Sequence, residues 1–231
     1  MNEIVLSVIL PSYREEENLR ILLPRLLETL QSLNVSYEII VVDTQEPMDH
    51  SNEVCVQYGI RYVSRRGGNR YGDAIRTGIA ETRGEYVLFM DADGSHTPEF
   101  IPKMFDFAGQ CDVVIASRYI DKGQTENNFM LVVMSRVLNV TYSLVLNLPC
   151  KDVSNSFKMY QAIHMKRLNL SCNNFDIVEE ILYKIHRYNP QITIKEIPFT
   201  FKKRMFGETK RNLLVFMLTY IFTMIKLRFR S

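Results

Sequence analysis

The sequence predicts an α/β fold in which a mostly parallel central sheet carries helices on both faces. Short apolar, β-branched runs alternate with segments whose apolar residues recur at helical spacing. The strand-like runs are apolar throughout, and polar residues follow directly where several of them end. Continuous apolar strands separated by helices indicate a parallel sheet that is covered on both sides. In such sheets, ligands bind beyond the carboxyl ends of the strands.

In the first third of the chain, the predicted order is strand, helix, strand, strand. The first apolar run is followed by Pro11 and Ser12, which favour a turn. Leucines then recur at intervals of three and four residues, which is the spacing of one helix face. The predicted elements are strand Ile4–Leu10, helix Asn18–Ser32, strand Tyr37–Val42 and strand Ile60–Val63.

The middle of the chain continues the alternation. Gly67, Gly68 and Gly72 surround the start of a helix but do not form a G-x-G-x-x-G motif after the first strand. We therefore expect these glycines to permit close packing and a tight turn into the helix, and we expect no nicotinamide cofactor. The predicted elements are helix Gly72–Thr82, strand Glu85–Met90, helix Pro98–Phe107 and strand Asp112–Ala116.

Two later segments are more apolar than the rest. Between Phe129 and Leu148, polar residues recur every fourth position from 135 to 147, so a helix there has a narrow polar stripe beside a broad apolar face. The run Leu213–Ile225 is followed by basic residues. Neither segment reaches the roughly 20 apolar residues of a membrane span. We expect both to lie in the headgroup plane of a membrane; completion of the core or a dimer interface is the alternative.

Composition limits the class of protein. The chain has 231 residues and a net charge of +2, which does not indicate a nucleic-acid partner. Residues 202–230 carry eight basic side chains against the single acid Glu208, a balance that favours an anionic surface. The four cysteines show no C-x-x-C pairing and no secretory signal precedes the first strand, so we expect a cytoplasmic protein on the membrane face. We predict a catalytic domain over 1–210 and a membrane-surface helix over 211–231.

Two aspartates follow the apolar run that ends at Met90. Residues two apart in an extended segment point the same way, so Asp91 and Asp93 can converge on one small ligand. Carboxylate oxygens suit Mg²⁺ or Mn²⁺, which keep several waters and bridge to substrate phosphates. A solvated turn is the usual setting of an isolated D-x-D tripeptide. Its position after a buried strand, beside the polar ends of other strands, favours a metal and phosphate site.

Longer motifs make the chain resemble a known family. They are PSYREEENL (11–19), IIVVD (39–43), GNRYGDAIRTG (68–78), DADGSHTPEFIPKM (91–104), ASRYIDKG (116–123), DVSNSFKMY (152–160), NFDIVEEIL (174–182) and EIPFTFKKRMFGETK (196–210). With these motifs the chain resembles the family-2 glycosyltransferases and, within them, the polyprenyl-phosphate (dolichyl-phosphate) mannose synthases. The resemblance implies a nucleotide-sugar-binding fold of the GT-A type and an enzyme that inverts the anomeric configuration of the sugar.

The resemblance also implies a nucleotide site. Pro11, Tyr13 and Glu15 would line the base and ribose, with Asp43 beside them. Family members usually carry a second aspartate after the one that matches Asp43, whereas this chain has Thr44, a difference that bears on base recognition.

The metal and diphosphate site follows from the same resemblance. Asp91, Asp93 and Ser95 would hold the metal, and the backbone at Ala92 would contact the diphosphate together with the two aspartates. Some relatives place a glutamine where Ser95 stands.

Basic residues are implied near the reacting phosphates. Arg118 and Arg204 match the family's anion-binding residues. Relatives carry a basic residue at the position of Leu131, so Arg136 is expected to take its role towards the acceptor phosphate, together with Lys210.

The acceptor decides whether the reaction needs a base. A phosphate monoester with a second pKa near ~6 is already ionised at neutral pH, whereas a hydroxyl acceptor needs a carboxylate to take its proton. Asp176, Glu179 and Glu180 on a predicted helix, Phe175–His186, are the candidates. Because Glu179 and Glu180 point about 100° apart, we expect one to be solvated and the other to pack or pair. His96 is expected in a turn cap or on the surface.

Together these observations predict a metal-dependent inverting glycosyltransferase. It would transfer a hexose, in the first place mannose from GDP-mannose, to a polyprenyl or dolichyl phosphate at a membrane surface. The alternatives are another sugar nucleotide, a saccharide hydroxyl as acceptor, or a non-catalytic subunit that binds a sugar nucleotide.

Overall fold

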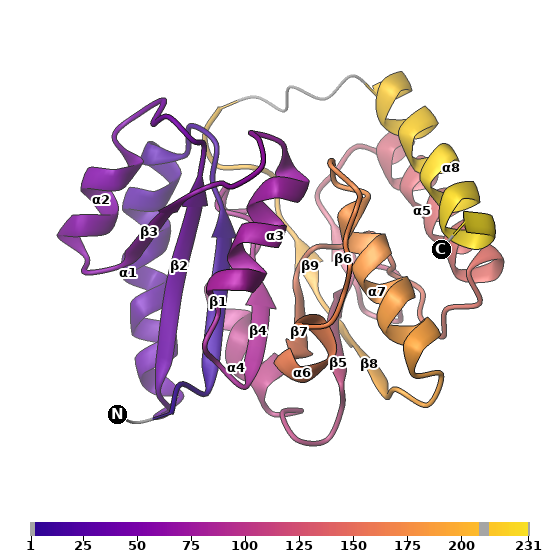
Figure 1. The fold of residues 1–231 in the computed structure, drawn as a ribbon, viewed down its shortest axis with the longest axis horizontal. Helices are drawn as coiled ribbons and strands as arrows, with labels where there is room; N and C mark the ends of the chain where they lie inside the picture. Colours follow the sequence, from indigo (N-terminus) through magenta and orange to yellow (C-terminus); the bar gives the residue numbers. More distant parts are fainter. Residues whose placement is uncertain (1–2, 208–212, 231) are drawn as a thin grey trace.

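The computed structural model describes residues 3–207 and 213–230, with side chains for 219–229 in the second stretch. Its core is a seven-stranded sheet with the order β3-β2-β1-β4-β7-β5-β8 (Figure 1). The strands are β1 (Leu6–Pro11), β2 (Tyr37–Asp43), β3 (Arg61–Ser64), β4 (Tyr86–Phe89), β5 (Val113–Ser117), β7 (Lys158–Gln161) and β8 (Ile194–Pro198). Neighbouring strands are parallel except at β7, which runs antiparallel to β4 and β5. Two short strands, β6 (Gln124–Thr125) and β9 (Thr200–Phe201), pair separately.

Helices cover both faces of the sheet, as the sequence predicts (Figure 1). They are α1 (Glu16–Ser32), α2 (Ser51–Gln57), α3 (Tyr71–Glu81), α4 (Ile101–Phe105), α5 (Phe129–Val145), α6 (Ala162–Met165), α7 (Ile177–Tyr188) and α8 (Leu213–Arg230). Along β1, Leu6, Val8 and Leu10 belong to one hydrophobic core and Ile9 to the other, because successive side chains of a strand point to opposite faces. The first core contains α1, α2 and α4, and the second contains α3, α5, α6, α7 and α8.

Most predicted elements form within a few residues of their expected bounds, and the helix predicted over Pro98–Phe107 forms in two parts and ends two residues early, at Phe105. A 3₁₀ turn, Pro98–Phe100, precedes the short helix α4. After Phe105 the backbone hydrogen bonds tighten into turns, and the chain reverses at Gly109, whose φ is +75°. A left-handed residue ends a helix, so the segment cannot continue to β5 as a helix.

The glycines of α3 permit close packing, as expected. The backbone N–H of Gly72 donates to the carbonyl of Asn173 at 2.8 Å. A β-carbon on Gly72 would stand 2.8 Å from the Asn173 Cα, and one on Gly78 would stand 2.6 Å from Ile9 Cγ2. Helix α3 therefore packs directly on strand β1 and on the segment that leads into α7.

Helices α5 and α8 lie side by side at one end of the molecule (Figure 1). The Tyr142 hydroxyl donates to the Tyr220 carbonyl at 2.6 Å, and the Thr223 hydroxyl donates to Asp176 on the α7 side at 2.6 Å. These contacts attach α8 to the rest of the fold. Within the described ranges, no helix has both the length and the apolar character needed to cross a bilayer.

Candidate functional site

A cavity of about 1210 Å³ opens beyond the carboxyl ends of the central strands. Its walls come from the loops after β1, β3 and β4, from the segment before β7, from α5 and from residues 201–207. Because β1, β3 and β4 run in parallel, their following loops meet at one sheet edge, which is where the sequence predicts the ligand. The predicted site residues that line this cavity are Pro11, Tyr13, Glu15, Asp91, Ala92, Asp93, Ser95, Arg118 and Arg204.

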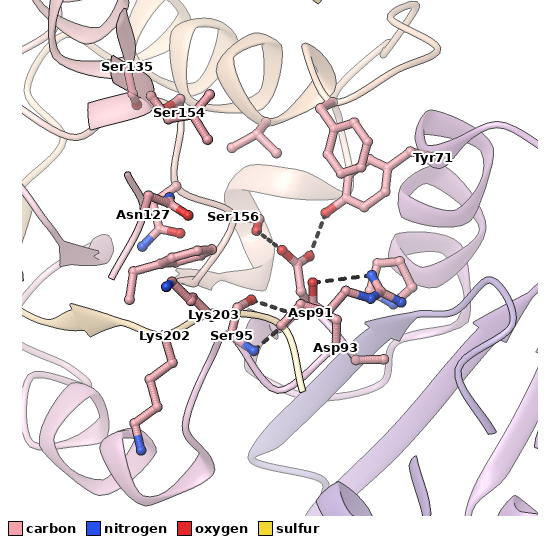
Figure 2. Close-up of a pocket in the computed structure, with 18 of the residues that line it drawn as sticks. Tyr71, Asp91, Asp93, Ser95, Asn127, Ser135, Ser154, Ser156, Lys202 and Lys203 are labelled. Carbon is pink, nitrogen blue, oxygen red and sulfur yellow. Dashed lines mark hydrogen bonds and ion pairs between the residues drawn. The ribbon is translucent and has the colours of Figure 1, made fainter. Parts of the chain in front are cut away.

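Asp91 is held in place by three hydrogen bonds, of which Figure 2 shows the two to its carboxylate. Its carboxylate accepts from the Tyr71 hydroxyl at 3.2 Å and from the Ser156 hydroxyl at 2.9 Å. Its backbone N–H donates to His96 Nδ1 at 2.9 Å. Since both donors to the carboxylate are neutral, the carboxylate is oriented without being neutralised.

Asp93 has a different environment. Its Oδ1 accepts from the Ser95 backbone at 3.0 Å and from the Ser95 hydroxyl at 2.5 Å (Figure 2). Its Oδ2 lies 3.4 Å from Arg204 Nη1. Ser95 is buried, and the structure gives its hydroxyl the role of orienting Asp93. A direct bond from Ser95 to a metal stays a prediction.

Arg204 joins the loop after β1 to the loop after β4. Its guanidinium pairs with Glu15 as well as with Asp93, and Glu15 also accepts from Asn18 at 2.5 Å. Burial raises the pKa of Glu15, although the Arg204 charge opposes this rise. Arg204 is therefore a cation on a long side chain, held between two carboxylates and within reach of any anion that enters beside Asp93.

His96 lies in the core below the aspartates, so the expectation of a surface position is wrong. The ring has no exposed area, stacks on Phe157 at 4.7 Å and approaches Asn155 Oδ1 at 3.2 Å. Burial lowers the pKa of His96, which favours the neutral ring that can accept the Asp91 N–H. His96 thus positions the turn that carries Asp91.

Arg118 is buried in an ion pair with Asp152. The two groups make a bidentate contact, with Nε–Oδ2 at 2.9 Å and Nη2–Oδ1 at 2.7 Å, and Nη2 also donates to the Ser154 hydroxyl at 3.0 Å. Burial opposes the charged carboxylate, but the Arg118 charge and hydrogen bonds lower the pKa of Asp152. Arg118 lines the cavity while its charge is largely balanced, so its effect on a bound phosphate is reduced.

The carboxylates considered as general bases lie outside the cavity wall. Glu179 and Glu180 are both fully buried, so the expectation that one of them is solvated is wrong. Glu180 accepts from the backbone of Ser171 and Cys172 and pairs with Lys184 at 2.8 Å. Asp176 accepts the Thr223 hydroxyl. All three residues therefore have structural partners or core positions, and none of them lines the cavity.

Glu179 is buried in the core behind the site, where the charge of Lys158 acts on it. Burial raises its pKa to about 8, with the charge of Lys158 acting in the opposite direction. Lys158 is also fully buried, and its ammonium group donates to the carbonyls of Val153, at 2.8 Å, and Asn155. The lysine thereby fixes the loop that carries Ser154 and Ser156 into the cavity.

Helix α5 turns its polar stripe towards the cavity. Ser135 lines the wall, and Asn139 is buried with its amide donating to the Ser154 hydroxyl at 2.9 Å. Leu131 lines the wall too, whereas Arg136 is exposed, with its guanidinium 5.6 Å from the Tyr119 ring centre, and does not line it. Lys210, the other residue predicted to bind the acceptor phosphate, lies outside the described residues.

Asp43 is buried behind the wall. Its carboxylate accepts from the Thr44 N–H at 2.8 Å and the Tyr62 hydroxyl at 3.0 Å, and burial raises its pKa. The side chain is not among those that line the cavity. Arg65, from the loop after β3, lines the cavity there, and its guanidinium donates to the Asn69 carbonyl at 2.7 Å.

The sequence does not predict several of the lining residues. Tyr71, Ser156 and Phe175 come from motifs quoted for the resemblance, but the motifs do not show that these residues meet at Asp91. Lys202 and Lys203 add positive charge at the same wall (Figure 2). Their basic run is visible in the sequence, and its position after the short strand β9 is the signal that could have placed it in the site.

The oxygens of Asp91 and Asp93 form a donor set that fits Mg²⁺ or Mn²⁺. In residues 3–207 and 213–230 no cluster of three or more His, Cys, Asp or Glu side chains could hold a metal by itself. Mg²⁺ typically uses one or two carboxylates together with waters and substrate phosphates, so a pair of aspartates at a cavity wall is sufficient.

Comparisons with known proteins agree with this geometry. Residues 7–168 match the model of the family described as glycosyl transferase family 2. A dolichol-phosphate mannosyltransferase from Pyrococcus furiosus is 33% identical over 211 residues, which cover 88% of this chain and 58% of that protein. The protein of the same name from Saccharomyces cerevisiae is 28% identical, with 88% of this chain and 80% of that protein covered. This chain thus spans less than two thirds of the length of the Pyrococcus protein.

Solved structures of glucosyl-3-phosphoglycerate synthase from Mycobacterium tuberculosis share the fold. The complex with Mn²⁺, UDP and phosphoglyceric acid has a TM-score of 0.73 at 18% identity, covering 99% of this chain and 80% of that one. The complex with Mn²⁺, UDP and glucosyl-3-phosphoglycerate has a TM-score of 0.71 at 17% identity, covering 97% and 80%. At such low identity the likeness concerns the fold alone.

Proposed function

The chain belongs to glycosyl transferase family 2, and from this premise we propose that it transfers a hexose from a nucleoside-diphosphate sugar to a polyprenyl phosphate at a membrane surface. Mannose from GDP-mannose is the proposed donor, because the similar proteins from Pyrococcus and Saccharomyces are named dolichol-phosphate mannosyltransferases. The observation that carries the proposal is a single cavity that reaches from the Asp91–Asp93 pair to helix α5, whose outward side chains are apolar.

The donor is proposed to lie along the wall formed by the loops after β1, β3 and β4. Pro11, Tyr13 and Glu15 would line the nucleoside, and Asp91 and Asp93 would hold Mg²⁺ or Mn²⁺ beside the diphosphate. A divalent cation there would supply charge stabilisation for the leaving diphosphate. Arg204 would increase this charge stabilisation by exchanging its carboxylate partners for phosphate oxygens. This exchange needs no proton transfer.

A phosphate acceptor explains the environment of the candidate bases better than a hydroxyl acceptor does. Asp176, Glu179 and Glu180 do not line the cavity, so none is placed to remove a proton from a hydroxyl. An ionised phosphate oxygen can attack unaided once it is held in line with the leaving group. The new bond joins this oxygen to the anomeric carbon as the bond from that carbon to the diphosphate breaks. The anomeric configuration is then inverted, and the nucleoside diphosphate leaves with the electron pair.

The exposed faces of α5 and α8 support a membrane-bound acceptor. Helix α5 directs the polar side chains of Ser135 and Asn139 inward, while its exposed side chains are apolar apart from Arg136. The exposed apolar side chains are Phe129, Met130, Val133, Val137, Val140 and Leu144. On α8 the exposed apolar side chains are Ile221, Phe222, Ile225 and Phe229. We call these ten side chains the apolar face. Exposed apolar area of this extent on adjacent helices is typical of contact with lipid or with another protein.

The test is transfer of label from radioactive GDP-mannose to a polyprenyl phosphate with Mg²⁺ or Mn²⁺. We expect chloroform-extractable label, and we expect Asp93→Asn to lower kcat/KM by a factor of roughly 10² or more, as for the loss of one electrostatic contact to a developing charge. Asp106→Asn, at an exposed position just after α4, is the matched control and should keep full activity. Absence of extractable label with every nucleotide sugar supplied would exclude the proposal.

A further inference from the structure

Two stacked aromatic rings line the cavity near Asp91, and the proposed transfer step gives no role to the rings themselves. Tyr71 begins α3 and Phe175 precedes α7, yet their rings stack with centroids 4.0 Å apart and planes 23° apart. Both rings line the cavity, together with Ser156 and Val178. Figure 2 shows the Tyr71 hydroxyl directed at Asp91. We call Tyr71 and Phe175 the aromatic pair.

Hydrogen bonds between the start of α3 and the segment before α7 hold the aromatic pair in place. Next to Tyr71, the Gly72 N–H donates to the Asn173 carbonyl at 2.8 Å. Arg76 donates to the Cys172 carbonyl at 2.5 Å and to Asn173 Oδ1 at 3.0 Å. Because these bonds join the first turn of α3 to the segment before Phe175, the two rings keep a fixed position, as a preorganised binding surface requires.

The position of the aromatic pair in the cavity indicates which part of a bound nucleotide sugar it contacts. Tyr13, Arg65, Leu131 and Ser135 all line the cavity. In the proposed function, Tyr13 and Arg65 border the nucleoside, and Leu131 and Ser135 on α5 border the acceptor. With the diphosphate beside Asp91, the sugar of the donor must occupy the space between the diphosphate and the acceptor. The aromatic pair borders this space.

The chemistry of this wall is suited to a hexose. A pyranose ring presents C–H groups on its faces and hydroxyls around its edge. The aromatic pair and Val178 offer apolar surface, while Ser154 and Ser156 offer hydroxyls on the neighbouring loop. Apolar C–H groups packed on aromatic rings lose water without losing hydrogen bonds, whereas a hydroxyl turned towards the rings would lose its partners.

We propose that the aromatic pair is the surface on which the hexose of the donor packs, and that it selects among hexoses by the orientation of their hydroxyls. This inference rests on the proposed function, since it assumes that the cavity binds a sugar nucleotide. It assigns the two rings to the sugar, whereas the Tyr71 hydroxyl acts on Asp91. The rings therefore contribute to the affinity for a nucleotide sugar and not to the affinity for the free nucleoside diphosphate.

The experiment compares the affinities of GDP and GDP-mannose by calorimetry in the presence of Mn²⁺, with UDP and UDP-glucose as a second set. We expect Phe175→Leu to weaken GDP-mannose binding about tenfold, the change expected for loss of part of one large apolar contact, while GDP binding stays unchanged. Tyr71→Phe keeps the ring and should retain most of the sugar's contribution. Phe107→Leu is the matched control, because Phe107 packs against the other hydrophobic core and does not line the cavity.

The outcomes separate the two proposals. If the wild-type protein binds none of these nucleotide sugars, the proposed function fails and the inference fails with it. If the wild type binds a nucleotide sugar but Phe175→Leu weakens the sugar nucleotide and the free diphosphate equally, or weakens neither, the inference alone is overturned. Should Phe175→Leu not fold, as judged by its melting curve, Tyr71→Leu is compared with Tyr71→Phe, which loses the same hydroxyl but keeps the ring. Tyr71→Leu must then bind GDP-mannose more weakly than Tyr71→Phe does, while the two variants bind GDP equally.

Discussion

Asp91 and Asp93 differ in the charge of the groups that contact their carboxylates. Tyr71 and Ser156 orient Asp91 with neutral hydroxyls, whereas Asp93 faces the charged guanidinium of Arg204 at 3.4 Å. A cation that binds between the aspartates competes with Arg204 only at Asp93. Binding of metal and diphosphate can therefore release Arg204 from Asp93 towards the phosphates while Asp91 keeps its position.

The buried pair of Glu179 and Lys158 makes stability depend on pH. Burial raises the pKa of Glu179 from 4.5 to about 8, so between these values the folded state binds more protons than the unfolded state and stability falls as pH rises. Burial lowers the pKa of Lys158 from 10.5 to about 8, which affects stability only above that range and with the opposite sign. Between about pH 5 and about 7.5, the difference in stability between the wild type and a Glu179 variant therefore reports on Glu179.

We expect Glu179→Gln to remove this loss of stability. The variant should melt like the wild type near pH ~5 and become more stable as the pH approaches ~7.5, by on the order of 1 kcal/mol or roughly 2–4 °C. Melting curves across the window measure the difference, and transferase activity should persist because Glu179 does not line the cavity. Glu17→Gln, at an exposed position in α1, is the control. An equal difference between Glu179→Gln and wild type at every pH would contradict the prediction.

At the scale of elements, α5 partly inverts the usual amphipathic pattern: its outer face is apolar apart from Arg136, and its inner face carries polar residues beside the buried Leu138 and Tyr142. Its polar residues Ser135 and Asn139 face the cavity and the Ser154 loop, while Phe129 and Leu144 on the outside are 83% and 76% exposed. A helix of a soluble protein normally places its apolar side inward. The inversion allows one helix to contribute polar groups to an acceptor site and apolar groups to a lipid surface.

Helix α3 depends on a glycine in its first turn. Replacing an exposed helical glycine by alanine usually stabilises a protein by about 1 kcal/mol. At Gly72 the same replacement should destabilise the protein, because the added carbon would approach the Asn173 backbone to 2.8 Å and the Cys172 carbonyl even more closely. We expect Gly72→Ala to lower the free energy of unfolding by about 1–3 kcal/mol, as for overpacking, measured by urea denaturation.

Ala80→Ser is the control for this prediction. It adds one atom at an exposed position of the same helix and should change the free energy of unfolding by less than about 0.5 kcal/mol. Stabilisation by Gly72→Ala would show that α3 and the segment before α7 can separate at little cost.

At the scale of the whole molecule, the cavity lies where two parts of the chain meet. Strands β1 to β4 and their loops supply the wall proposed for the nucleotide, and α5, the Ser154–Ser156 loop and residues 201–207 supply the opposite wall. The antiparallel strand β7 joins them by pairing with β4 on one side and β5 on the other. The apolar face is adjacent to the second wall, so a lipid phosphate could reach the donor without leaving the membrane surface.

Vesicle binding tests this arrangement. We expect the wild-type protein to sediment with vesicles of phosphatidylcholine and phosphatidylglycerol, and the double variant Val137→Asp, Leu144→Asp to bind at least about tenfold more weakly, because charge on an interfacial apolar face opposes insertion. Val56→Asp is the matched control, since Val56 is 71% exposed on α2, away from the apolar face. Equal sedimentation of all three proteins would contradict a role of the apolar face in membrane binding, whereas Mn²⁺-dependent binding of GDP should be the same in each.

The sequence alone determines the alternation of strands and helices and the polar residues that follow the strands. Both depend on local periodicity and on short motifs, so the sequence is enough to place Asp91 and Asp93 at a ligand-binding edge. The weakly periodic strands β7 and β8 and the short helices α2 and α6 are not predicted by the same reasoning, because their patterns are too brief to distinguish from loops.

The tertiary structure decides which predicted residues share one cavity. Asp43 follows its strand as Asp91 does, yet Tyr62 and Thr44 enclose it behind the wall. Tyr71 and Phe175 lie far apart in the sequence and meet only because Gly72 lets α3 approach the segment before α7. Contacts of this kind depend on how distant segments pack and on whether one side chain leaves room for another. A local sequence pattern predicts neither.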